Sequence, residues 1–258
     1  MRLALIIAVL CSLAGVAHAT PAGESQKAYL TLAIIDDLGQ NLPRDRRVLA
    51  LPGPVTTAIM PDTPHAADFA REAHRAGKTV ILHMPMDPAT GPFAWHPELP
   101  LAELEKRLNA ALLAVPYAVG INNHMGSRMT AEPEAMTWLV AELQRRHLFL
   151  LDSRTSASTV AAAEAQRIGL ASLSRDIFLD DERTAAAITA QFEAAIKLAH
   201  KQGSVVMIGH PYPQTLAVLE RELPRLKAQG VEWIDIKSMI SLRSNQAMGR
   251  HGKNGQYR

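Results

Sequence analysis

A regular alternation of short apolar runs with longer amphipathic segments constrains the fold of this chain more than any other feature. Eight apolar runs are predicted to be strands: 29–35, 55–60, 79–83, 118–122, 148–151, 177–179, 204–208 and 232–236. Most of these runs are continuously apolar rather than alternating. Continuous runs are typical of parallel strands that are covered on both faces of the sheet.

Helical patterns lie between the apolar runs. The predicted helices are 64–76, 101–113, 133–146, 184–202 and 214–229. Gly203 and Gly230 stand just past two of them, where a left-handed helix cap is needed. No long linker divides the chain, so we predict an α/β fold with a single irregular (β/α) barrel over 20–243. A doubly wound open sheet is the alternative.

The two ends of the chain carry different signals. Arg2, an apolar run over 3–16 and a small-residue site ending at Ala19 predict a signal peptide over 1–19, which directs the mature chain to the periplasm or outside the cell. A membrane anchor is disfavoured because the run is shorter than the roughly 20 residues of a spanning helix. A lipoprotein is disfavoured because no small residue precedes Cys11. The polar stretch 244–258 is expected to be a disordered tail.

Composition excludes several classes of protein. Cys11 is the only cysteine and lies in the predicted signal peptide, so the mature chain has no disulfide, cysteine nucleophile or thiolate metal site. The net charge is only +2, with basic residues scattered, so no nucleic-acid partner is expected. No G-x-G-x-x-G or Walker sequence follows a predicted strand, so a nucleotide cofactor has no support. No membrane span is expected in the mature chain.

Four polar segments each begin where an apolar run ends. They are 35–39, 82–88, 122–128 and 208–211. Carboxylates and imidazoles that recur at strand ends are predicted to meet at one mouth of the barrel. Such a mouth can hold a metal ion together with the acid and base that work beside it.

The first two segments offer carboxylates and one imidazole. Asp36 and Asp37 can divide their work, one binding a cation and the other acting as a base, unless they form only a solvated acidic turn or a helix cap. His83 and Asp87 stand four residues apart on a loop stiffened by proline, where both can reach one cation. The alternative for His83 is a core histidine bonded to the backbone.

The later segments offer two more histidines. His124 lies among small polar residues and is a candidate metal ligand, and Arg128 nearby can hold a carboxylate or a developing oxyanion. His210 follows a strand and a glycine, which suits a general acid. Asp152 is either a ligand, an orienting group for a histidine, or a structural partner of Arg154.

Together these segments resemble the divergent polysaccharide deacetylase family, a remote branch of the NodB-like carbohydrate esterases. The resemblance spans residues 30–241 and is carried by Ile-Asp-Asp-Leu-Gly, Leu-His-Met-Pro-Met-Asp-Pro, Asn-Asn-His-Met-Gly-Ser and Ile-Gly-His-Pro. It implies a distorted (β/α) barrel. In active relatives it also implies a divalent metal, usually zinc-like, beside which water attacks the carbonyl of an N-acetyl group.

The resemblance assigns roles to particular residues. Asp36 matches the catalytic base, Asp37 the metal-binding carboxylate and His83 the first metal-binding histidine. His210 matches the histidine that protonates the leaving amine.

The chain departs from the family pattern at two places. The family has a second histidine four residues after the first, where this chain has Asp87, and His124 is expected to complete the ligand set instead. The arginine-proline segment of the parent family is missing, and Arg128 is its stand-in. An added carboxylate shifts metal preference towards harder cations.

The function predicted from the sequence is a metal-dependent hydrolase with zinc as its expected cofactor. It would remove acetyl groups from an N-acetylated cell-envelope polysaccharide such as a peptidoglycan-type glycan. The alternative is a catalytically inactive periplasmic protein that binds glycan or a partner during cell-wall remodelling.

Overall fold

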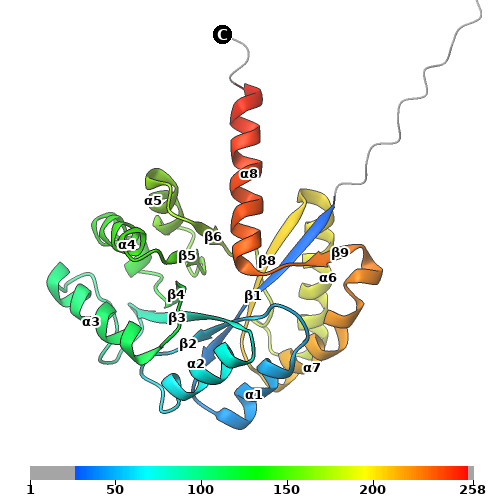
Figure 1. Cartoon of the computed structure of the whole chain (residues 1–258), viewed down its shortest axis with the longest axis horizontal. Coiled ribbons are helices and arrows are strands. Elements are labelled where there is room, and N and C mark those ends of the chain that lie inside the picture. The colour runs from blue at the N-terminus through cyan, green and yellow to red at the C-terminus, as the bar shows by residue number, and fades with distance from the viewer. Residues whose placement is uncertain (1–26, 255–258) are drawn as a thin grey trace, which may run out of the picture.

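The computed structural model describes residues 27–254, so the predicted signal peptide and Cys11 lie outside the described residues. Within this range nine strands form one sheet, and all neighbouring strands that pair are parallel (Figure 1). The strands are β1 (Ala28–Leu38), β2 (Thr56–Ile59), β3 (Thr79–Met86), β4 (Gly120–Met125), β5 (Phe149–Asp152), β6 (Ser172–Ser174), β7 (Ile177–Phe178), β8 (Ser204–Gly209) and β9 (Val231–Trp233). Their order is β6-β5-β4-β3-β2-β1-β8-β7, and β9 pairs with β1.

The two edges of this sheet belong to one short segment of chain. β6 pairs with β5, and β7 pairs with β8. Between them, the backbone N–H of Arg175 donates to the carbonyl of Asp152 and that of Asp176 donates to the carbonyl of Val206. Residues 172–178 therefore bridge the gap between β5 and β8, although β6 and β7 do not pair with each other. The predicted irregular (β/α) barrel is confirmed.

Helices lie around the outside of the strands, except the C-terminal helix, which packs over one end of the barrel (Figure 1). They are α1 (Leu42–Ala50), α2 (Ala66–Arg75), α3 (Leu101–Ala114), α4 (Pro133–Arg145), α5 (Ala161–Ile168), α6 (Ala185–Gln202), α7 (Pro213–Glu222) and α8 (Ile236–Asn254), with 3-10 turns at η1 (Met129–Ala131), η2 (Leu223–Arg225) and η3 (Lys227–Gln229). Among residues 27–254, none of the helices combines the length and the apolar character that crossing a membrane requires.

The core has two parts because side chains alternate between the faces of each strand. Val80, Leu82, Val205 and Met207 pack outward in the larger cluster, beneath the helices. The residues between them face the barrel interior and form a second cluster with the start of α8. This interior cluster includes Ala58, Ile81, Leu151, Val206, Ile208, Ile236 and Met239. α8 thus closes the end of the barrel opposite the carboxyl ends of the strands.

The C-terminal end differs from the sequence prediction. The strand expected over 232–236 ends at Trp233, and α8 begins at Ile236 because the carboxylate of Asp235 accepts the backbone N–H groups of Lys237 and Ser238, at 2.9 and 3.0 Å. The tail expected to be disordered from Ser244 continues this helix to Asn254. Extending a helix that is already nucleated costs little, even for a polar sequence.

Two helices and one strand were also missing from the sequence prediction, namely α1, α5 and β6. β6 has three residues and α5 has eight, which is too short for a clear periodic pattern.

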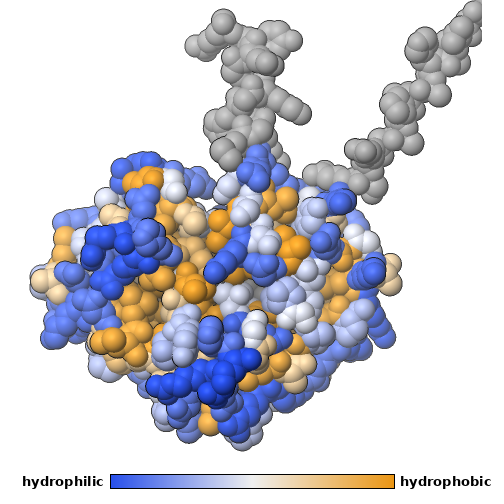
Figure 2. Space-filling model, viewed as in Figure 1, coloured by the Kyte–Doolittle hydropathy of each residue, from blue (hydrophilic) through white to orange (hydrophobic). Residues whose placement is uncertain are grey.

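Figure 2 shows apolar residues gathered beside the base of α8, where Phe149, Leu170 and Ile240 line a pocket at the closed end of the barrel.

Candidate active site

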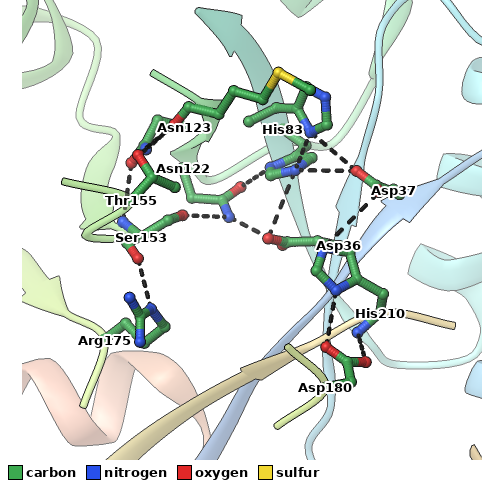
Figure 3. Close-up of polar contacts among 12 residues, drawn as sticks. Asp36, Asp37, His83, Asn122, Asn123, Ser153, Thr155, Arg175, Asp180 and His210 are labelled. Atoms are coloured by element: carbon green, nitrogen blue, oxygen red, sulfur yellow. Dashed lines mark hydrogen bonds and ion pairs between the residues drawn. The ribbon is translucent and has the colours of Figure 1, made fainter. Parts of the chain in front are cut away.

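The polar side chains at the carboxyl ends of the strands line one cleft of about 390 Å³. Strand alternation places them there. His83 is two residues after Ile81, and His210 is two residues after Ile208, and both of these apolar residues face the barrel interior. The two histidines therefore project towards the barrel mouth, together with residues from β1 and β4 (Figure 3).

A bulge in β1 lets two adjacent carboxylates share this mouth. Ile35 pairs with Thr57 and Leu38 pairs with Ile59, so three steps along β1 match two steps along β2. Asp37 takes up the extra residue with a φ of 55°, in the left-handed region. Without the bulge, Asp36 and Asp37 would point to opposite faces.

Three donor atoms converge at the centre of the cleft. The Oδ1 of Asp37 lies 3.3 Å from the Nε2 of His83 and 3.0 Å from the Nδ1 of His124. The two imidazole nitrogens are 3.1 Å apart. Ligands at roughly 2.0–2.1 Å from a tetrahedral zinc ion lie about 3.3 Å from one another. Asp37 Oδ1 is also buried without a hydrogen bond, so these atoms fit a shared divalent cation.

Asn122 orients His83 for such a role. The side-chain N–H₂ of Asn122 donates to Oδ1 of Asp36 at 3.0 Å, so its carbonyl oxygen faces the Nδ1 of His83 at 2.8 Å. An amide oxygen only accepts, so His83 carries a proton on Nδ1. In the neutral imidazole, Nε2 then presents its lone pair to the centre of the cleft. This is the usual arrangement of a metal-binding histidine.

The two carboxylates are held in different electrostatic states. Burial raises the pKa of Asp36, which is 2% exposed, and this outweighs the nearby imidazoles of His83 and His210. Burial also acts on Asp37, but the neighbouring imidazoles of His124, His83 and His210 outweigh it and lower the pKa of Asp37 far below its usual range. Asp37 is therefore ionised and able to bind a cation, while Asp36 is a carboxylate with increased affinity for a proton.

His210 is held by a buried carboxylate. Asp180 accepts the backbone N–H of His210 at 2.7 Å, the ring Nδ1–H at 2.9 Å and the hydroxyl of Thr215 at 2.7 Å. Burial acts to lower the pKa of His210, but the bond to Asp180 and the charges of Asp36 and Asp37 raise it to about 9. The Nε2 of His210 faces the cleft, 3.8 Å from Oδ2 of Asp37.

Three predicted site residues lie elsewhere. Arg128 does not line the cleft; it forms ion pairs with Asp87, at 3.0 Å, and with Glu98. Asp87 is likewise held by Arg128 and by the Nδ1 of His96 at 3.1 Å, so it does not join His83 at a common ion. Asp152 alternates with Leu151, which faces the barrel interior. Its carboxylate accepts the backbone N–H of Arg154, so it is a structural residue.

Several residues that line the cleft were not predicted from the sequence, among them Asp180, which holds His210. Asp180 follows the two-residue strand β7, which is too short to mark a strand end in the sequence. The pair Asp180 and Asp181 after an apolar run was the available signal. The small polar residues around His124 suggested that an asparagine or serine would orient that histidine, but the side chain of Asn122 contacts His83 instead. Ser153 adds a hydroxyl that accepts from Asn122 at 3.2 Å.

The protein is thus an α/β protein whose parallel barrel carries carboxylates and imidazoles at its mouth. The sequence profile of the divergent polysaccharide deacetylases matches residues 33–240, and the chain belongs to this family. It is 43% identical over 197 residues to an uncharacterised protein of Haemophilus influenzae, covering 75% of this chain and 70% of that protein. It is 42% identical over 192 residues to YibQ of Escherichia coli K12, covering 73% of this chain but 60% of YibQ.

Solved structures share the fold at low sequence identity. The uncharacterised protein ATU2773 of Agrobacterium tumefaciens superposes with a TM-score of 0.78 at 19% identity, covering 84% of this chain and 91% of that one. The catalytic domain of a peptidoglycan N-acetylglucosamine deacetylase from Eubacterium rectale superposes with a TM-score of 0.53 at 14% identity, covering 84% of this chain and 94% of that one. A mutant of BA3943, described as a CE4 family pseudoenzyme, superposes with a TM-score of 0.53 at 13% identity, covering 84% of this chain and 68% of that one.

Proposed function

We propose that this protein is a metal-dependent deacetylase of N-acetylated cell-envelope polysaccharide. The observation that carries the proposal is the convergence of Asp37, His83 and His124 beside two further groups suited to proton transfer, Asp36 and His210. One carboxylate and two imidazoles are a ligand set suited to zinc. A bound divalent ion would supply a Lewis acid that polarises the acetyl carbonyl and activates the attacking water.

The chain's own residues supply the proton transfers. Asp36 has a raised pKa and lines the cleft, so it is placed to take the proton that the attacking water loses. His210 is placed to hold a proton on Nε2, because Asp180 accepts the proton on Nδ1 and its carboxylate raises the pKa of His210. As the carbon–nitrogen bond breaks, His210 gives its Nε2 proton to the departing amine. The products are acetate and a glycan amine.

The predicted signal peptide over 1–19 supports a periplasmic or secreted location, where N-acetylated envelope glycans are found. The solved deacetylase from Eubacterium rectale acts on peptidoglycan, as its description states. Its likeness to this chain is one of fold, so the peptidoglycan-type substrate belongs to the proposal.

Two variants of adjacent residues test the proposal. Asp37→Asn should abolish stoichiometric divalent metal, measured by elemental analysis of purified protein. Asp36→Asn should keep the metal but lose about 10²–10⁴-fold in acetate release from an N-acetylglucosamine oligomer, the range typical of a lost general base. The proposal fails if the wild-type protein holds no divalent metal, or if Asp36→Asn releases acetate as fast as wild type.

A catalytically inactive glycan-binding protein is the second candidate. It is favoured by Asp87, which stands where the family has its second metal-binding histidine but pairs with Arg128 and His96. The resemblance in fold to a CE4 family pseudoenzyme is compatible with it. Stoichiometric metal or glycan binding without acetate release from any N-acetylated glycan would support this candidate.

A further inference from the structure

A row of three rings, tilted against one another, forms one wall of the candidate active site. The ring of Phe178 lies 5.3 Å from that of His210, with an angle of 42° between their planes. The ring centroid of Tyr212 lies 5.3 Å from that of His210, with an angle of 33° between the two planes. All three residues line the cleft. Tyr212 therefore extends the wall beyond the imidazole that faces the leaving group.

A guanidinium lies over each end of this row, but the two differ in their partners. Arg175 lies 4.8 Å from the ring centroid of Phe178 and donates to the backbone carbonyls of Ser153 and Arg154. Arg183 lies 4.1 Å from the ring centroid of Tyr212. Within residues 27–254, the Arg183 side chain has no hydrogen bond or ion pair, and the residue is exposed. Its donors are therefore available to a ligand.

The charges around Arg183 make this position distinctive. Asp36, Asp37, Asp180 and Asp181 line the same cleft. Arg183 is the only lysine or arginine among the described residues that line it. Arg183 therefore marks the one place among the described lining residues where a permanently charged side chain would attract an anionic group on a bound glycan.

Stacking prepares the guanidinium for this contact. A guanidinium that lies over an aromatic face is held by cation–π attraction and keeps its N–H donors directed outward at its edge. Those donors match a carboxylate in a two-point contact. Asp181 lines the cleft two residues before Arg183 and would repel a doubly charged phosphate more strongly than a carboxylate, so a carboxylate is the better match.

We propose that Arg183, positioned by Tyr212, is a carboxylate-binding residue that selects N-acetylated glycans with an acidic group near the acetamido group. This inference rests on the proposed glycan ligand of the cleft, and it names the class of glycan. The carboxylate can come from a lactyl ether, as in N-acetylmuramic acid, or from a neighbouring uronic acid.

Binding measurements test the inference separately from hydrolysis. The probes are glycan oligomers of equal length: N-acetylglucosamine alone, N-acetylglucosamine alternating with N-acetylmuramic acid, and N-acetylglucosamine alternating with glucuronic acid. Affinities are measured by calorimetry on the full chain in an Asp36→Asn background, which prevents turnover. Arg183→Gln is compared with Arg71→Gln, which makes the same change in net charge on α2, where Arg71 pairs with Asp68 away from the cleft.

The inference predicts that the Asp36→Asn protein binds at least one acidic oligomer more tightly than the neutral one. Arg183→Gln should reduce this preference by about 10-fold or more, the scale of one charge-assisted pair. Arg71→Gln should leave it unchanged, and Tyr212→Leu should reduce it with Arg183 still present. Which acidic oligomer responds to Arg183→Gln identifies the source of the carboxylate.

Equal affinity for acidic and neutral oligomers would overturn the inference, as would a preference that Arg183→Gln leaves intact. If the wild-type protein released no acetate but kept an Arg183-dependent preference for acidic oligomers, the deacetylase proposal would fail. The proposed role of Arg183 in binding a carboxylate would still be supported.

Discussion

The Nδ1 of His83 and the side-chain oxygen of Asn122 lie 2.8 Å apart, although 39 residues separate them in the chain. Neighbouring strands bring them together, since His83 pairs in register with Asn122 between β3 and β4. The same amide donates to Asp36 on β1. Asn122 therefore links the candidate metal ligand to the candidate base, and its loss should disturb both.

Asn122→Ala should weaken metal binding without removing a ligand. His83 would lose the partner that fixes its tautomer, and loss of such a partner typically costs 10- to 100-fold in metal affinity. The measurement is competition for zinc against a chelator of known affinity. Asn109→Ala is the matched control, because Asn109 pairs with Arg146 and does not line the cleft. Unchanged zinc affinity in Asn122→Ala would contradict the orienting role.

Asp180→Asn should lower the pKa of His210, which is about 9 in the metal-free protein. The pKa of His210 in the folded protein exceeds the ordinary value of 6.5. The stability that the folded state gains from protonated His210 is therefore fully present below about pH 6.5. It is lost as pH rises towards 9, because the unfolded state gives up its proton first. The free energy of unfolding of metal-free Asp180→Asn, measured in urea, should therefore lie furthest below that of wild type at pH 6. The difference between the two proteins should be smaller near pH 9.5.

An NMR titration of the His210 ring checks the same pair directly. Wild type should titrate near 9 and Asp180→Asn closer to the ordinary value. A titration midpoint that does not move between the two proteins would show that Asp180 does not control the proton on His210.

The sequence located eight of the nine described strands, although several strand ends differ from the prediction, and it did not show which side chains face the barrel interior. Continuously apolar strands such as 148–151 give no alternation, because both faces are buried. Leu151 faces inward and Asp152 does not, and only the register of β5 against its neighbours decides this. The bulge that turns Asp37 towards Asp36 also depends on pairing with β2. The local sequence shows neither.

Gly39→Ala should destabilise the turn that carries the paired carboxylates. Gly39 has a φ of 102°, and a Cβ there would lie 2.2 Å from the hydroxyl oxygen of Thr63. That hydroxyl donates to the carbonyl of Met60, so it cannot shift without breaking a buried bond. The expected loss in the free energy of unfolding is about 2–4 kcal/mol, from backbone strain together with the clash.

Gly77→Ala is the matched control for Gly39→Ala. Gly77 also has a positive φ, of 70°, but a Cβ there would meet nothing within 4 Å. Its cost should be about 1–2 kcal/mol, the strain of the left-handed conformation alone. Both values are measured by urea unfolding. An equal loss for the two variants would mean that Thr63 yields easily and that the turn is not tightly packed.

Arg128→Gln distinguishes the structure from the sequence prediction. The sequence suggests that Arg128 stabilises an oxyanion, whereas the structure pairs it with Asp87 and Glu98 outside the cleft. We expect zinc affinity and acetate release within about twofold of wild type, as for a surface substitution. Loss of an oxyanion-stabilising donor would instead cost roughly 10²–10³-fold in kcat. A loss of that size would return Arg128 to the active site and require the segment after β4 to move when glycan binds.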